Sequence, residues 1–424
     1  MNMKRIAVLL CAGVMALAAV SCQKDSPKPA PPMSPAEQQA RLNDAGIASL
    51  KEIDPDNWRS FAETCIQLAQ NFKYVDEGNY GELAQQMERW FQAVQAGDGY
   101  ETYVVTLQLS KLKGDCTIKN NVFHYTPSDN PLTLVYEFDG NGKTYKLSFE
   151  ATEGDTNVYE INRSEWGSWD EHGNPVEKTE IDKAVIPTHV AVHVTENTVS
   201  FIDFTADPTV KDLNKDGVID WDDEVLANIR LSIPGYVLSL DQLRYASMAV
   251  ATDVELLHGN KSVIAAHLNG KLGIREWVKA SLPQGDVTLS YVDGEIRHLG
   301  GEVILKGKMD NELGNSIATT TGIATEAEAR QIAAKLEQAI SAELYYDNNP
   351  TLQAKFCVLV LEDSSNHTWY LDQGIHFFDG SEDMRLEDFF NAEDFKPLLD
   401  QVNTLTGKLS LYFYKYFNDN AFIR

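Results

Sequence analysis

The sequence predicts an α+β fold, in which an N-terminal helical segment precedes an antiparallel β-rich body with a few helices. Between residues 34 and 97, apolar residues recur at spacings of three and four, which is the period of an α-helix. From about residue 98 to 205 the spacing changes to two, with hairpin-type turns between the apolar runs, which indicates strands. Because the strands arrive as hairpins and not as regular βαβ units, we expect antiparallel sheets.

The helical segment has a clear start signal. Ser34 offers an N-cap, Pro35 suits the first helical position and Glu37 completes a capping box. A further helix is expected after Pro55 and a third over residues 80–96, each with large apolar side chains along one side. We interpret these stripes as core packing between helices.

The β-rich region, residues 98–205, contains a predicted hairpin in which residues 134–138 and 145–149 flank an Asp-Gly-Asn-Gly turn. His189 and His193 alternate with valines on a further expected strand. Four residues apart on a strand, they share one face but stand about 13 Å apart, too far to bind one metal ion. We therefore assign the valines to the core side and the histidines to the polar side.

The last region, residues 206–424, is predicted to mix helices and strands, and it begins with a calcium-type loop. Its clearest helix is expected over residues 325–344, where a Thr-Glu-Ala-Glu capping box opens an apolar stripe. Two further helices are expected, at residues 221–229 and 386–402. Strands are expected at residues 290–292, 303–305, 356–361, 368–371 and 409–416.

The chain is strongly acidic. Its 424 residues include 36 basic and 63 acidic side chains, which gives a formal charge of −27. A field of this sign repels the phosphates of nucleic acids and anionic lipid surfaces. We therefore expect no nucleic acid partner, and we interpret the acidity as a solubilising surface.

Residues 1–22 have the three parts of an export signal. Lys4 and Arg5 form a positive start, and residues 6–20 form an apolar stretch too short to span a bilayer comfortably. Small residues then lead to Cys22. This pattern resembles the lipobox of bacterial lipoproteins, in which the cysteine thiol takes a diacylglyceryl group.

The lipoprotein resemblance implies a signal peptide over residues 1–21, a lipid on Cys22 and a Pro-rich tether over residues 22–33. Ala19 departs from the pattern, because leucine is commonest at that position. Gln23, rather than aspartate, follows the cysteine, which by the same resemblance favours the outer membrane of a Gram-negative cell. We therefore expect a lipid-anchored protein of the cell envelope, on either the periplasmic or the surface face.

After processing, three further cysteines remain: Cys65, Cys116 and Cys357. An odd and widely scattered trio is not a disulfide framework. Cys65 falls on a helical apolar stripe and Cys357 in a strand-like run, so both suit small buried apolar positions. We therefore predict no disulfide.

Residues 212–223 read DLNKDGVIDWDD and have the ligand spacing of a calcium loop. Calcium takes about six to eight oxygens, and alternate residues of a tight loop can converge theirs on one point. The pattern resembles EF-hand and dockerin loops, with aspartate at the twelfth position where an EF-hand has glutamate. It implies one structural Ca²⁺, and the alternative is an acidic turn that binds no metal. The expected ligands are Asp212, Asn214, Asp216, the Val218 carbonyl, Asp220 and Asp223.

Two tryptophans, Trp166 and Trp169, fall in a stretch with glycine and proline that we expect to be a loop. Aromatic faces in such a loop offer a stacking surface for sugar rings. The alternative is that they pin the loop to the core.

No nucleophile elbow, zinc-ligand spacing or other catalytic constellation is recognisable. We therefore favour a non-catalytic envelope protein with a binding or assembly role, whose ligand is a glycan or a protein. The alternative is a hydrolase of envelope or other polysaccharides, whose carboxylates the sequence does not identify. A deep cleft with two facing carboxylates would favour the hydrolase, and a shallow surface would favour binding.

Overall fold

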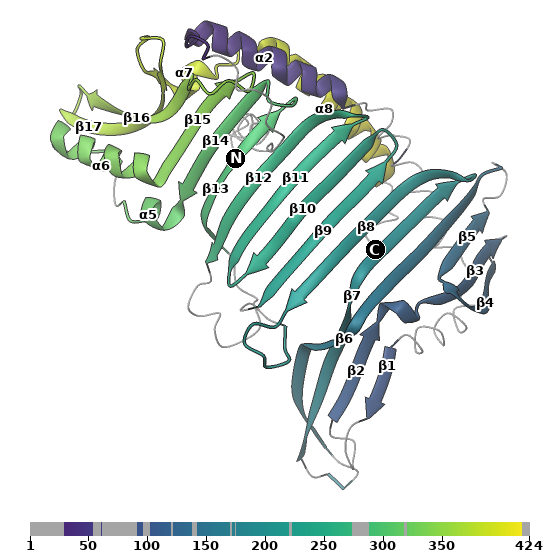
Figure 1. Cartoon of the computed structure of the whole chain (residues 1–424). Helices are drawn as coiled ribbons and strands as arrows, with labels where there is room; N and C mark the ends of the chain where they lie inside the picture. The colour runs from purple at the N-terminus through teal and green to yellow at the C-terminus, as the bar shows by residue number, and fades with distance from the viewer. Residues whose placement is uncertain are drawn as a thin grey trace. The chain divides into compact units, whose positions relative to one another are not determined.

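The computed structural model describes residues 29–53, 61, 91–95, 102–119, 122–137, 142–169, 172–173, 175–219, 223–273, 288–317 and 320–417. Strands make up most of this part of the chain and helices are few (Figure 1), so the fold is α+β in composition but mainly β. The chain divides into two compact units. Unit 1 contains Met1–Arg59 and Ala249–Arg424, and unit 2 contains Ser60–Met248.

Unit 2 is a mostly antiparallel assembly of strands. Its strands are β1 (Phe91–Gln95), β2 (Thr102–Gln108), β3 (Lys113–Lys119), β4 (Val122–Pro131), β5 (Thr133–Glu137), β6 (Thr144–Trp169), β7 (Pro175–Glu196), β8 (Val199–Lys211), β9 (Glu224–Ile233) and β10 (Tyr236–Ala246), with a short 3₁₀ helix, η2, at Leu109–Lys111. The long hairpin β6–β7 is its centre, and β7 also pairs with β2 and β8. Among the described strands, β2 with β7 and β3 with β5 pair in parallel.

The two faces of β7 differ as the sequence predicts. Val194 lies in a buried cluster with Phe201, while His193 lies directly opposite Asp203 on β8. The Nδ1 atom of His193 is 2.8 Å from a carboxylate oxygen of Asp203. His189 makes the same kind of contact, at 2.6 Å, with the carboxylate of Asp207, four residues farther along β8. The predicted hairpin between β5 and β6 is also confirmed by their antiparallel pairing.

Unit 1 is an antiparallel meander in which each strand pairs with the next from β11 to β18. Its strands are β11 (Ala249–His258), β12 (Lys261–Gly273), β13 (Thr288–His298), β14 (Val303–Asp310), β15 (Ile340–Tyr346), β16 (Ala354–Asp363), β17 (Thr368–Phe377) and β18 (Met384–Arg385). Its helices are α2 (Pro35–Glu52), α5 (Asn311–Asn315), α6 (Glu326–Ala339), α7 (Leu386–Phe389) and α8 (Lys396–Phe417).

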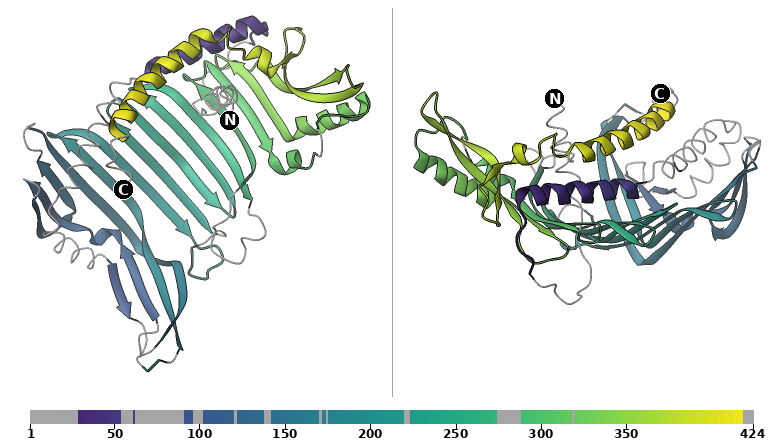
Figure 2. Two further views of the ribbon diagram at one scale, coloured as in Figure 1. Left: turned by 180° about the vertical axis from the view of Figure 1, so that it is seen from behind. Right: turned by 90° about the horizontal axis from the view of Figure 1, so that it is seen from above.

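The core of unit 1 joins the N-terminal helix to strands that come some 300 residues later in the chain. Leu42 of α2 packs in one buried cluster with Val303 and Leu344, and Leu398 of α8 packs against the same cluster. Figure 2 shows α2 and α8 running alongside each other, in agreement with their contacts. One face of this sheet is therefore covered by helices. None of the helices within the described ranges is long and apolar enough to cross a membrane.

Both helix starts that the sequence predicts are present, the first with a complete capping box and the second with its N-cap bond. The Ser34 hydroxyl accepts from the backbone N–H of Glu37, and the Glu37 carboxylate accepts from the Ser34 N–H. Thr325 caps α6 through its hydroxyl. The expected end of that helix is wrong, because residues 340–346 form β15 and pair with β14. Ile340 and Leu344 are four residues apart, so they continue the apolar stripe of a helix but would also share one face of a strand. The spacing alone therefore does not distinguish a helix from a strand that pairs with β14.

Three other expected elements are wrong. Residues 409–416 belong to the long helix α8, since the apolar positions of this C-terminal stretch fit a helical period once they are read from Leu398. Residues 224–229 form strand β9, because β8 and β10 pair with it on both sides. Residues 91–95 form β1, which pairs with β2. In each case a short apolar run fits the spacing of a helix and of a strand alike, and pairing or packing with neighbouring elements decides which one forms.

The helix expected over residues 386–402 is present as two helices, α7 and α8, separated by residues 390–395. Most of the helical segment expected between residues 54 and 90 lies outside the described residues, as does Cys65. Cys116 and Cys357 are buried free thiols. Burial raises the pKa of Cys116 to about 11 and the pKa of Cys357 to about 12, so neither is a reactive thiolate near neutral pH.

Candidate functional site

The calcium-type loop connects β8 to β9 in unit 2. Lys211 and Glu224, the last and first residues of the two strands, pair in register and form an ion pair at 2.6 Å. This pairing places Asp212 and Asp223, the first and twelfth positions of the loop, at the two sides of one closed turn. The loop is therefore flanked by strands, whereas an EF-hand loop is flanked by helices.

Asp212 organises the first half of the loop through both of its carboxylate oxygens. One oxygen accepts from the backbone N–H of Lys215 at 2.5 Å, and the other accepts from the N–H of Gly217 at 2.8 Å. Gly217 has a φ of +81°, a conformation that favours glycine and that the sixth position of this kind of loop requires. The local geometry therefore has the turn that the sequence spacing predicts.

The next two expected ligands also bind backbone groups within the loop. The Asn214 side-chain oxygen accepts from the N–H of Asp216 at 3.0 Å, and an oxygen of Asp216 accepts from the N–H of Val218 at 2.8 Å. The loop is also bonded to β6. The backbone N–H of Ile219, the residue after Val218, donates to the carbonyl of Glu160 at 3.1 Å.

Asp223 is fully buried, and one of its oxygens accepts from the Leu213 N–H at 2.9 Å. Asp220 lies outside the described residues. Within the described ranges, no three histidine, cysteine or acidic side chains are close enough together to hold a metal by themselves. A calcium shell here therefore needs the Asn214 amide oxygen, the Val218 carbonyl and water besides the carboxylates. The chemistry of this donor set, all oxygen and mostly anionic, fits calcium.

The other sequence-predicted residues lie elsewhere. Trp166 and Trp169 belong to strand β6, where their backbones pair with Lys178 and Pro175 of β7. They therefore lie in a ladder and not in a loop. Cys22 precedes the first described residue.

A charged hollow on the sheet of unit 1 is the site that the sequence did not indicate. Its volume is about 320 Å³, and it is shallow and open to solvent. Neighbouring residues on a strand point to opposite faces, so Glu343 points away from the helix-covered face that contains Leu344. The lining residues are His267, Tyr291, Asp293, Gly294, Glu295, Lys306, Gly307, Lys308, Ser341 and Glu343.

Glu295 is the most strongly held carboxylate of the charged hollow. Its oxygens lie 2.7 Å from Nε of Arg297 and 2.9 Å from Nζ of Lys306. Burial alone would raise the pKa of Glu295, but the hydrogen bonds from Lys306 and Arg297 outweigh it and hold the pKa below its ordinary value of 4.5. Glu295 is therefore an anion near neutral pH and not a proton donor.

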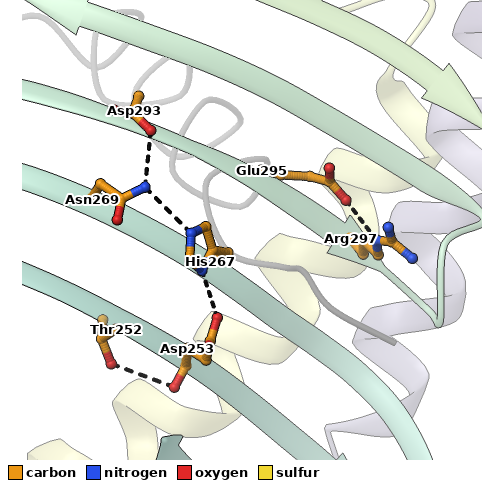
Figure 3. Close-up of polar contacts among 7 residues, drawn as sticks. All are labelled: Thr252, Asp253, His267, Asn269, Asp293, Glu295 and Arg297. Atoms are coloured by element: carbon orange, nitrogen blue, oxygen red, sulfur yellow. Dashed lines mark hydrogen bonds and ion pairs between the residues drawn. The ribbon is translucent and has the colours of Figure 1, made fainter. Parts of the chain in front are cut away.

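A row of polar side chains continues from the hollow across β13, β12 and β11 (Figure 3). The Asn269 amide lies 3.0 Å from an oxygen of Asp293 and 3.3 Å from Nε2 of His267, and Nδ1 of His267 lies 2.7 Å from an oxygen of Asp253. Because an amide NH₂ group only donates, its contact with Nε2 places the His267 proton on Nδ1, where Asp253 accepts it. The imidazole is thereby held in one orientation.

The opposite side of the hollow carries an aromatic ring beside an exposed cation. The hydroxyl of Tyr345 donates to Glu343 at 2.7 Å, and Nζ of Lys306 lies 5.3 Å from the centre of the Tyr345 ring. Burial and the adjacent Glu343 raise the pKa of Tyr345 to about 12. Lys308 is exposed and makes no ion pair with any residue in the described ranges.

These groups offer a polar ligand hydrogen-bond donors, acceptors and one uncompensated ammonium, on a surface whose carboxylates are already oriented. The site was not found from sequence because its members come from four strands and meet only through register: Glu295 lies opposite Lys306, and Lys306 opposite Glu343. The only available signal was alternating charge on each strand, which is ordinary for an exposed sheet face.

Comparison with known proteins does not add a function. No protein-family model, no curated protein and no solved structure matches the chain significantly.

Proposed function

We propose that this protein is a lipid-anchored, non-catalytic binding protein of the cell envelope, and that the charged hollow of unit 1 binds its ligand. Between the two ligand classes that the sequence leaves open, a glycan and a protein, the hollow favours a glycan. Its volume is at the lower end of small-molecule sites, and its lining combines three carboxylates, two lysines, the Ser341 hydroxyl and one tyrosine ring, that of Tyr291.

The observation that carries this proposal is the paired state of Glu295. A glycosidase needs a carboxylic acid that stays protonated near neutral pH, which requires a raised pKa. Glu295 is instead held as an anion by two cations. An open surface with ionised, fixed carboxylates suits hydrogen bonding to sugar hydroxyls better than acid catalysis.

The binding proposal is tested on an array of oligosaccharides from bacterial envelopes and from plant polysaccharides, followed by calorimetry with any oligosaccharide retained. Lys308→Ala and Glu343→Gln should each weaken binding at least about tenfold, because each removes one charge-assisted hydrogen bond. Lys335→Ala, an exposed lysine on α6, is the matched control and should bind as the wild type does. Wild-type affinity in both hollow variants would place the ligand elsewhere. Release of reducing ends from the same oligosaccharides would instead establish the hydrolase.

The anchor is part of the same proposal and rests on the lipobox-type sequence that ends at Cys22. In a Gram-negative host, Cys22→Ser should move the protein from the membrane fraction to the soluble fraction, and mass spectrometry of the wild type should detect acyl groups. A wild type without acyl mass, together with a membrane-bound Cys22→Ser variant that keeps its signal, would contradict the anchor.

We further propose that the loop between β8 and β9 binds one structural calcium through Asp212, Asn214, Asp216, the Val218 carbonyl, Asp220 and Asp223. Two features of the loop support it, the left-handed Gly217 and the all-oxygen donor set. A single loop of this kind suits the weak affinity of extracellular sites, on the order of 10⁻⁴–10⁻³ M. Its role would be to stabilise unit 2 and not to sense calcium.

A further inference from the structure

Residues 30–33, which precede α2, are held by one turn of unit 1. The backbone N–H of Ala30 donates to the side-chain oxygen of Asn349 at 3.3 Å, and the N–H of Met33 donates to the side-chain oxygen of Gln353 at 2.6 Å. Both partners lie in the turn between β15 and β16, residues 347–353. Part of the stretch expected to be a tether is therefore bound to the folded body.

Contacts from α2 hold the same turn. The amide of Gln38, which is fully buried, donates to the Met33 carbonyl at 2.8 Å and to the Gln353 carbonyl at 3.1 Å. Arg41 forms an ion pair with Asp347. The turn between β13 and β14 lies at this end too, because the Asn348 amide donates to the Gly300 carbonyl at 2.9 Å.

The chain between the lipid and this end is short. Ala30 lies eight positions after Cys22, and at about 3.6 Å per position this distance reaches roughly 29 Å when the chain is fully extended. The stretch contains Pro27 and Pro29, which favour an extended conformation at about 3.1 Å per residue. A lipid on Cys22 therefore limits how far this end of unit 1 can move from a bilayer.

Charge favours the same end. In a chain of formal charge −27, residues 348–353 read NNPTLQ and carry no charge, and Asp347 is paired with Arg41. The turn itself therefore presents no net charge to phospholipid headgroups, although the exposed Glu37 at the start of α2 stands at the same end.

We propose that the end of unit 1 formed by residues 30–33 and 347–353 faces the phospholipid headgroups of the anchoring membrane, within about 30 Å of them. This inference rests on the proposed lipidation of Cys22. The opposite end of the same strands, at α5, lies farther away by about the length of β14, whose eight residues span roughly 26 Å.

The test uses the full-length lipidated protein in phosphatidylcholine vesicles that contain a lipid with a fluorescent acceptor on its headgroup. A donor dye is placed at Pro350→Cys or, as the matched control, at Asn315→Cys, both exposed positions of unit 1. Because energy transfer falls steeply with distance and the two ends differ by about 26 Å, transfer from position 350 should exceed transfer from position 315 at least about twofold. Wild-type protein labelled in parallel gives the background from its own cysteines.

A second variant isolates the tether. Insertion of about 20 Gly/Ser residues between Ser26 and Pro27 adds on the order of 25 Å of average reach, so the ratio of the two transfers should fall toward one. Equal transfer from both positions without the insertion, or greater transfer from position 315, would overturn the orientation. A ratio that the insertion leaves unchanged would overturn the tether as its cause. Absence of acyl mass on the wild type would refute the lipid anchor itself, and flotation with the vesicles identifies that case separately.

Discussion

The calcium-type loop and the charged hollow both concentrate carboxylates, but they compensate them in different ways. In the loop, Asp212 and Asp216 accept hydrogen bonds from backbone N–H groups, which fix the carboxylates but leave their net charge. In the hollow, Glu295 is matched by two cationic side chains. The loop carboxylates therefore keep their negative charge, whereas in the hollow the charge of Glu295 is compensated by two cations, and Asp293 and Glu343 accept hydrogen bonds from the neutral side chains of Asn269 and Tyr345. The comparison predicts that the loop responds to metal and the hollow responds to pH and to a polar ligand.

The largest effect should follow from disturbing the backbone pairing that assembles the hollow. A Cβ atom at Gly294 would lie 2.4 Å from the carbonyl oxygen of His267, so Gly294→Ala forces β12 and β13 apart. We expect a loss of about 2–3 kcal/mol in the free energy of unfolding of unit 1, measured by urea titration and by hydrogen exchange in β12–β14. Gly314→Ala, whose added Cβ meets nothing within 4 Å, is the control. Equal stability of the two variants would show that the close pairing is not needed.

Calcium should produce the next largest effect, and only on unit 2. Saturating calcium should raise the free energy of unfolding by roughly 1–3 kcal/mol over EDTA, since the ion binds only the native state. Asp216→Asn keeps an oxygen to accept from Val218 but removes one anion, so it should lose most of this increment. Asp241→Asn, at an exposed position of β10, should keep it, and magnesium should not reproduce it. Identical melting of the wild type in EDTA and calcium would reduce the loop to an acidic turn.

The hollow should show a smaller effect that depends on pH. Folding lowers the pKa of Glu295 below its ordinary value of 4.5, so its contribution is present above about pH 4.5 and is lost as pH falls through the folded pKa. Glu295→Gln should therefore cost about 1 kcal/mol at pH 7 and progressively less below pH 4.5. Urea titrations across pH, with the exposed Glu382→Gln as control, measure the difference. A cost that is the same at pH 3 and pH 7 would argue against the ion pairs as its source.

The smallest stability effect should come from Lys308, the hollow's unpaired cation. Because no ion pair is broken, Lys308→Ala should change the free energy of unfolding by less than about 0.5 kcal/mol. The same variant is expected to weaken oligosaccharide binding, so thermal melting and binding should separate. A large loss of stability would mean that Lys308 has a structural partner and would weaken its assignment to ligand binding.

The two sites also differ in how far sequence alone could predict them. The loop was visible because its oxygens come from twelve consecutive residues, and Gly217 has the expected left-handed backbone. The hollow was not visible, because Glu295 and Glu343 become neighbours of Lys306 only through strand register. Spacing within one segment is a local property, whereas register depends on the whole sheet.

The fold shows the same division. The helix starts at Ser34 and Thr325 were predicted, because capping depends on three or four adjacent residues. The helix over residues 409–416 and the strand over residues 224–229 were not, because their short apolar runs fit both periods. Pairing partners and helix packing select one of the two, and the local sequence does not contain them.

Unit 1 is discontinuous in the chain, and this has a consequence for the order of events during synthesis. Gln38 of α2 finds its partner Gln353 only 315 residues later. At about 5–20 residues per second, the ribosome takes roughly 15–60 s to cover that interval. Unit 2, which is continuous from Ser60 to Met248, is complete well before then. The first helix to emerge is therefore among the last to find its place, and the newly synthesised chain has to keep it unaggregated for that time.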